Sequence, residues 1–181
     1  MQVFPQERIL ASLQEAQVQV NSRDIPLQKR KMVEVFGWHE DVVNVMEKQY
    51  RKFLALSKVL DTCSIDVKIA PTRLIDEFWH LHIMDTEKYH DDCAAVFNGY
   101  FHHYPYFGFV DDADVASWRH ASAAANDVWK VAYGEDLYGD DDGDAYDMDR
   151  QFHNEMSAAI LASPGFAVAR CRTQCKPVKC K

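Results

Sequence analysis

The sequence predicts an all-α protein, built as an irregular bundle of about six or seven helices with an aromatic loop and an extended C-terminal tail. Several segments repeat apolar residues at spacings of 3 and 4, which is typical of one face of a helix. Many of these segments also begin and end at residues that favour helix termini. With 181 residues and 48% hydrophobic content, the chain can bury roughly 70% of its unfolded surface and needs no cross-links to fold.

Three helices are predicted in the N-terminal part of the chain. Residues 6–20 place apolar side chains on one face, residues 27–36 follow a start signal at Asp24 and Pro26, and residues 40–60 form the clearest helix. The apolar face of the first helix consists of Ile9, Leu13, Ala16 and Val20, and that of the third includes Val43, Met46, Tyr50, Phe53, Leu54 and Leu60. Residues 61–71 are expected to form a linker.

The next two helices are predicted from their caps. Thr72 is a suitable N-cap for a helix that reaches about residue 83. Asp85 and Thr86 can cap a helix over residues 87–97, which Asn98 and Gly99 should end. Two further helices are expected over about 112–133 and 150–161. Residues 100–109, which contain six Phe and Tyr residues interrupted by His, Pro and Gly, should form an irregular aromatic loop.

One helical domain is expected over residues 1–165, followed by a flexible tail over residues 166–181. The net charge of −8 comes from an acidic loop at residues 134–149, which holds eight acids and no Lys or Arg, whereas the rest of the chain is balanced. The tail is basic, with charges at Arg170, Arg172, Lys176, Lys179 and Lys181. A protein partner could bind the acidic loop or the basic tail.

Charge and hydropathy also exclude several classes of function. Nucleic-acid binding is not expected, because phosphate contacts need a broad basic face and the body of the chain has none. No apolar run approaches the ~20 residues of a membrane-spanning helix. The first residues show no basic segment followed by an apolar one, so we expect no secretory signal and a cytoplasmic location.

The segment from residue 76 to residue 103 carries the chemistry. It holds five of the eight histidines, and Asp76, Tyr89 and Cys93 are interspersed with them. Imidazole, carboxylate and thiolate are ligands that Zn, Fe or Cu ions prefer, so the sequence predicts a transition-metal site. The five histidines are His80, His82, His90, His102 and His103.

Spacing on the helix selects among these residues. Asp76 and His80 are four apart and share a face, so the carboxylate can be a second ligand or can orient the imidazole. His80 and His82 point roughly 200° apart on a regular helix and cannot both reach one ion. Either the helix unwinds near Trp79, or one of the two histidines has a different role.

A tight turn at residues 84–86 could bring the face of Tyr89 and Cys93 against that of His80, and His103 would then arrive from the aromatic loop. The expected ligands are ranked on this hypothesis. His80 and His103 come first, His82 next, and Asp76 follows as a ligand or an orienting group. Tyr89, Cys93 and His102 rank lower, Cys93 because a buried, inert thiol is expected there. His90 is expected on the surface.

The order of these residues resembles the core motif of the glycine-rich domain-containing protein-like family. That pattern consists of an Asp, a Trp-His-x-His, a Tyr, often a Cys, and a downstream His, here Asp76, Trp79, His80, His82, Tyr89, Cys93 and His103. The resemblance covers roughly residues 33–109. The family occurs in plants and bacteria, has no firmly assigned reaction, and its plant members are linked to development and stress responses. This chain has only seven Gly, so roles attached to the glycine-rich region do not transfer.

Two functional hypotheses follow from these residues. The first is a metal-binding protein, and a metal-dependent enzyme if an open position on the ion activates water, with Asp76 or Glu77 as general base. Such a site could equally be structural. The alternative is a helical protein-interaction module with a structural His cluster and no catalysis. The chain shows neither a Ser-His-Asp order nor a glycine-rich phosphate loop.

Two weaker patterns lie near the C-terminus. Residues 140–149 partly match a calcium loop, with Asp140 and Asp149 in ligand positions, but Tyr138 stands where the first acidic ligand belongs, so Ca binding is not expected. Cys171, Cys175 and Cys180 lack the Cys-x₂-Cys spacing of a zinc ribbon. These tail thiols could bind a soft metal, form a redox pair or be inert.

Overall fold

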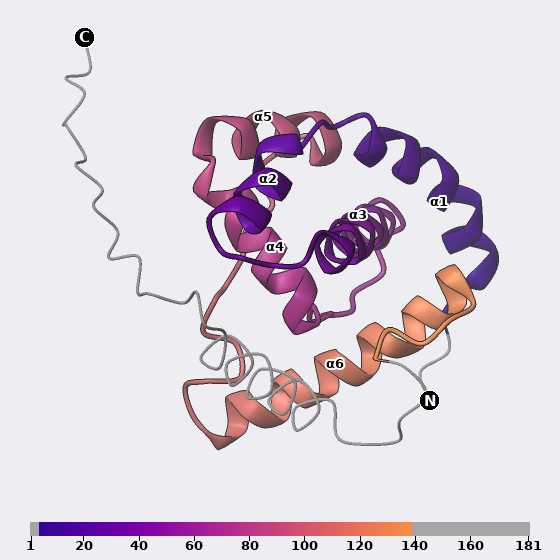
Figure 1. Ribbon diagram of the computed structural model, residues 1–181. Coiled ribbons are helices and arrows are strands. Elements are labelled where there is room, and N and C mark those ends of the chain that lie inside the picture. Colours follow the sequence, from indigo (N-terminus) through magenta and orange to yellow (C-terminus); the bar gives the residue numbers. More distant parts are fainter. Residues whose placement is uncertain (1–3, 139–181) are drawn as a thin grey trace, which may run out of the picture.

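The computed structural model describes residues 4–138, which form six α-helices and no strand (Figure 1). In chain order the helices are α1 (Gln6–Asn21), α2 (Pro26–Glu34), α3 (Glu40–Thr62), α4 (Arg73–Met84), α5 (Thr86–Phe97) and α6 (Asp112–Tyr133). The all-α prediction is therefore confirmed. The helix predicted over residues 150–161 lies outside the described residues. None of the six helices has both the length and the apolar character to cross a membrane.

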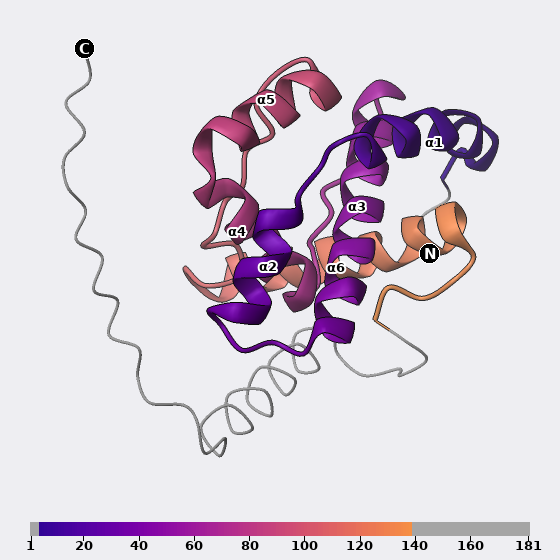
Figure 2. The ribbon, with the colours of Figure 1, turned by 45° about the horizontal axis from the view of Figure 1, so that its top comes forward.

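Helix α3 forms the centre of the fold. Figure 1 views it almost along its axis, with the other helices around it, and Figure 2 shows its length between α1 and α2. It packs against α1, α2 and α4. A helix that is surrounded in this way needs apolar residues around much of its circumference. The buried residues of α3 meet this need: Val43, Met46, Tyr50, Phe53, Leu54, Ala55, Leu56, Val59 and Leu60.

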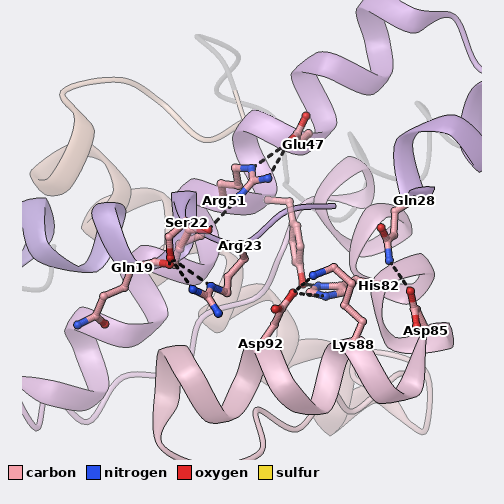
Figure 3. Close-up of polar contacts among 12 residues, drawn as sticks. Gln19, Ser22, Arg23, Gln28, Glu47, Arg51, His82, Asp85, Lys88 and Asp92 are labelled. Carbon is pink, nitrogen blue, oxygen red and sulfur yellow. Dashed lines mark hydrogen bonds and ion pairs between the residues drawn. The ribbon is translucent and has the colours of Figure 1, made fainter. Parts of the chain in front are cut away.

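Both ends of α4 are fixed by side-chain hydrogen bonds. Thr72 caps α4, because its hydroxyl accepts a hydrogen bond from the backbone N–H of Ile75 at 3.4 Å, as the sequence predicts. Asp85, between the two helices, accepts a hydrogen bond at 3.0 Å from the buried side chain of Gln28 on α2 (Figure 3). Helix α5 ends at Asn98, whose left-handed backbone (φ 56°) terminates the helix.

The aromatic loop has no helix or strand and is fixed to the start of α6. The carboxylate of Asp114 accepts hydrogen bonds from the backbone N–H groups of residues 108, 109 and 110, at 2.7, 3.0 and 3.1 Å. Gly108 has a φ of +86°, and a Cβ atom there would lie 2.8 Å from Cγ of Trp118 on α6. Glycine is therefore needed for both the backbone conformation and the close approach.

Candidate metal site

Asp76, His80 and His103 converge on one point, with potential ligand atoms that all lie within 4.8 Å of one another. Nε2 of His103 lies 2.7 Å from Nε2 of His80 and 3.3 Å from Oδ1 of Asp76. Nδ1 of His80 lies 3.7 Å from Oδ2 of Asp76. Ligand atoms that surround a zinc ion at roughly 2.0–2.2 Å are about 3–3.5 Å apart. These three side chains could therefore hold a metal ion after small adjustments.

Two of the three residues come from α4 and the third comes from the aromatic loop. The cap at Thr72 places Asp76 in the first turn of α4, and His80 follows one turn later on the same face. His103 reaches them from a segment that comes after the whole of α5. The placement of His103 therefore depends on tertiary contacts.

Trp79 and Tyr89 supply these contacts. The Trp79 ring stacks on Phe101 at a centroid distance of 5.0 Å and lies 4.4 Å from the His103 ring. The indole N–H donates to the Tyr89 hydroxyl at 2.9 Å, and this hydroxyl donates to the backbone carbonyl of Phe101. Tyr89 thus connects α4, α5 and the loop instead of joining the three converging residues.

Burial favours the neutral forms of Asp76 and His103. The side chain of Asp76 is 22% exposed and that of His103 is 11% exposed. Burial raises the pKa of Asp76, although His80 opposes this shift. Burial, together with the nearby His80, lowers the pKa of His103 to about 4. His103 is therefore a neutral imidazole at pH 7, which is the form that binds metals.

His82 lies on the other side of α4, in a separate buried network (Figure 3). Its Nδ1 lies 2.9 Å from the hydroxyl of Tyr50, and its Nε2 lies 3.1 Å from the carboxylate of Asp92, which also accepts a hydrogen bond from Lys88 at 2.9 Å. Burial lowers the pKa of His82. Helix α4 is continuous from Arg73 to Met84, so it does not unwind near Trp79 and its two histidines point in different directions. Of the two alternatives left by the sequence, the structure therefore shows the second, in which His82 has a different role from His80.

The remaining candidate residues are also apart from the three converging ones. Cys93 is a buried free cysteine, and burial raises the pKa of its thiol, which favours the unreactive form. His102 and His90 are exposed. Glu77 forms an ion pair with Arg73 one turn earlier on α4.

Two predicted features cannot be placed in this geometry. The calcium-loop pattern at residues 140–149 and the tail thiols Cys171, Cys175 and Cys180 lie outside the described residues. The three converging side chains are thus the cluster on which a functional argument can be built.

A pocket of about 750 Å³ reaches this cluster and includes Asp76 and His103 in its wall. The other walls come from the end of α3, the connection over residues 65–72, the aromatic loop and Trp118 on α6. Sequence reasoning did not identify this pocket. A sequence signal for the pocket lies in the connection between α3 and α4, where Ile65, Val67 and Ile69 alternate with polar residues outside any predicted helix.

No protein-family model matches the chain, and comparisons with curated proteins and with solved structures also find no match. The resemblance to the glycine-rich domain-containing protein-like family therefore stays a prediction from the motif residues. The functional argument rests on the geometry of the site.

Proposed function

We propose that the protein binds one divalent transition-metal ion through Asp76, His80 and His103 and uses it in a reaction on a small molecule. The convergence of two imidazoles and one carboxylate, of which Asp76 and His103 line a pocket of about 750 Å³, carries this proposal. Structural zinc sites are usually closed by four protein ligands, whereas catalytic sites have three and leave a position open. A three-ligand site beside a cavity fits the catalytic pattern.

The ligand types favour zinc or ferrous iron. Two histidines and one carboxylate occur both in zinc hydrolases and in non-haem iron enzymes. When bound, such an ion can polarise a carbonyl group or lower the pKa of coordinated water to about 7. In this arrangement Asp76 acts as a ligand and is not available as a general base. Glu77 remains the candidate base, although it is paired with Arg73.

Calorimetric titration of the full-length, tag-free protein with zinc chloride tests the proposal. We expect about one ion per chain, and His80→Ala should weaken binding at least about 100-fold, because loss of a ligand costs more than loss of an outer-shell partner. His90→Ala is the matched control, since His90 is exposed on α5. Circular dichroism should show that both variants remain folded.

The tail thiols require a second background for this titration. The experiment should be repeated with Cys171, Cys175 and Cys180 all replaced by serine, so that zinc bound by thiolates is not counted. If zinc binds with unchanged affinity in His80→Ala on this background, the proposed site is wrong. A folded protein that binds no zinc and no ferrous iron would favour the alternative of an interaction module with a structural His cluster.

A further inference from the structure

The pocket beside Asp76 and His103 has the size of a small-molecule site. Its volume of about 750 Å³ lies within the ~300–1,000 Å³ that is usual for ligand pockets. A single ion and its water molecules would fill only a small part of that space. The pocket therefore has room for an organic molecule next to the metal site.

Aromatic side chains form much of the wall near the cluster. Trp79 and Phe101 line the pocket, but they stack on each other and Phe97 stacks on Phe101 as well, so they present their edges and not their faces to it. Phe107 and Trp118 line it as well, and the apolar side chain of Ile69 adds to it. Phe107 and Trp118 are half-buried, and aromatic rings bind other rings by stacking and by edge-to-face contacts, so these walls favour a planar ring system as ligand.

The charges that line the pocket favour an anionic end on this ligand. Asp61 and Asp76 balance Lys68 and Arg73, so the lining is close to neutral before any ion binds. A divalent ion would leave an excess of positive charge. Among residues 4–138, Lys68 makes no ion pair or hydrogen bond, and its exposed ammonium group is available to an anion.

We infer that the pocket binds a small planar aromatic carboxylate, with its carboxylate toward the metal and its ring against Phe107 and Trp118. This inference rests on the proposed function, because the ion provides the charge that selects the carboxylate. It goes further by naming the class of molecule on which the site acts. Charge complementarity and the aromatic side chains that line the pocket are the observations that support it.

Calorimetric titration with 2-naphthoate, a planar aromatic carboxylate, tests the inference. Zinc-loaded protein should bind this probe at least about tenfold more tightly than zinc-free protein, because the carboxylate gains the metal as partner. Naphthalene-2-methanol has the same ring system without the charge. It should bind zinc-loaded protein at least about tenfold more weakly than 2-naphthoate does.

Phe107→Ala tests the position of the ring. Phe107 lines the pocket and is not part of the buried core, so the variant should fold and keep its zinc affinity while binding of 2-naphthoate weakens about tenfold. Phe36→Ala is the matched control, because Phe36 is 43% exposed and lies outside the pocket. It should leave both affinities unchanged.

The possible results separate the two proposals. If zinc binds but 2-naphthoate does not, the ligand class is wrong and the metal site stands. Equal binding of the probe with and without zinc, or no effect of Phe107→Ala, also overturns the ligand assignment. If His80→Ala has no effect on zinc binding, the proposed function fails and this inference fails with it.

Discussion

Replacement of Tyr50 by phenylalanine should destabilise the protein by about 1–3 kcal/mol and leave its zinc affinity unchanged. Tyr50 is fully buried on α3, and its hydroxyl lies 2.9 Å from Nδ1 of His82. The substitution removes this hydroxyl and keeps the ring, which packs on Phe78 at a centroid distance of 5.3 Å. It therefore tests one hydrogen bond with very little loss of packing.

The magnitude follows from the roles of the two atoms. The carboxylate of Asp92 can only accept from Nε2 of His82, so Nδ1 of this histidine is the acceptor and Tyr50 is the donor. Burial raises the pKa of Tyr50 well above its ordinary value, which keeps the hydroxyl protonated. Without the Tyr50 hydroxyl, Nδ1 of His82 has no hydrogen-bond donor, and the His82 side chain is only 3% exposed to water that could replace it. An unsatisfied buried acceptor costs about 1–3 kcal/mol.

Urea unfolding followed by circular dichroism measures this loss. The midpoint should fall with an unchanged slope, and the melting temperature should fall by about 2–4 °C for each kcal/mol. Tyr106→Phe is the matched control, because Tyr106 is 57% exposed and outside the network; its stability should stay within about 0.5 kcal/mol. A loss below about 0.5 kcal/mol for Tyr50→Phe would refute the assigned hydrogen bond. Weaker zinc binding would show that the network and the metal site are not independent.

Two further predictions concern the aromatic loop and the charge states of the site. In the same urea assay, Gly108→Ala should destabilise the protein by about 1–3 kcal/mol, because Gly108 has a φ of +86° and a Cβ atom there would lie 2.8 Å from Trp118. Gly99→Ala is the control and should have almost no effect, because a Cβ atom at Gly99 would meet no atom within 4 Å. The metal-free protein should also lose stability as the pH falls from about 6.5 toward 4, because the unfolded chain binds a proton at His103 that the folded chain, with a pKa of about 4 there, does not. The raised pKa of Asp76 acts with the opposite sign and offsets part of this loss. His103→Ala should show a smaller fall in urea midpoint between pH 7 and pH 5, and an equal or larger fall would contradict this account.

The helices could be predicted because apolar spacing and caps are local properties of the sequence. The segment expected at residues 112–133 is α6 (Asp112–Tyr133), and the expected cap at Thr72 begins α4. The shared face of Asp76 and His80 follows from the same local rule. All of this depends on residues within one or two turns of each other.

The role of His82 was also present in the sequence as a pattern. Ile75, Phe78, Trp79 and His82 are spaced 3, 4 and 7 from the first, which is the buried stripe of α4. The residue type of His82 favours a metal ligand, whereas its position on the apolar face of α4 indicates a buried side chain. The stripe predicts a buried histidine, and the structure provides it with two hydrogen-bond partners.

The position of His103 could not be derived in this way. It belongs to a loop without periodicity, and the contacts that place it come from Trp79 on α4 and Tyr89 on α5. The pocket depends on the same loop and on Trp118 of α6. Such contacts depend on how helices meet, which local patterns do not encode.

A comparison of the two histidine clusters gives the strongest physical reason to prefer a metal site to a structural cluster. Around His82 every polar atom meets its complement: the Tyr50 hydroxyl donates to Nδ1, Nε2–H donates to Asp92, and Lys88 donates to the same carboxylate. The His82 network is therefore satisfied by its own hydrogen bonds and needs no bound ion. Around His80 the carboxylate is held less closely: the carboxylate oxygens of Asp76 lie 3.7 Å from Nδ1 of His80 and 3.3 Å from Nε2 of His103.

The 2.7 Å between the Nε2 atoms of His80 and His103 has room for one proton, and the carboxylate of Asp76 lies 3.3 Å from the second of these nitrogens. Folding also moves Asp76 and His103 toward their neutral forms, at a cost in stability. A divalent cation would supply the positive charge that all three groups face and would replace the shared proton. A purely structural cluster would be expected to close into short hydrogen bonds, as the His82 network does, so the longer contacts of Asp76 with the two imidazoles favour a cation between the three side chains.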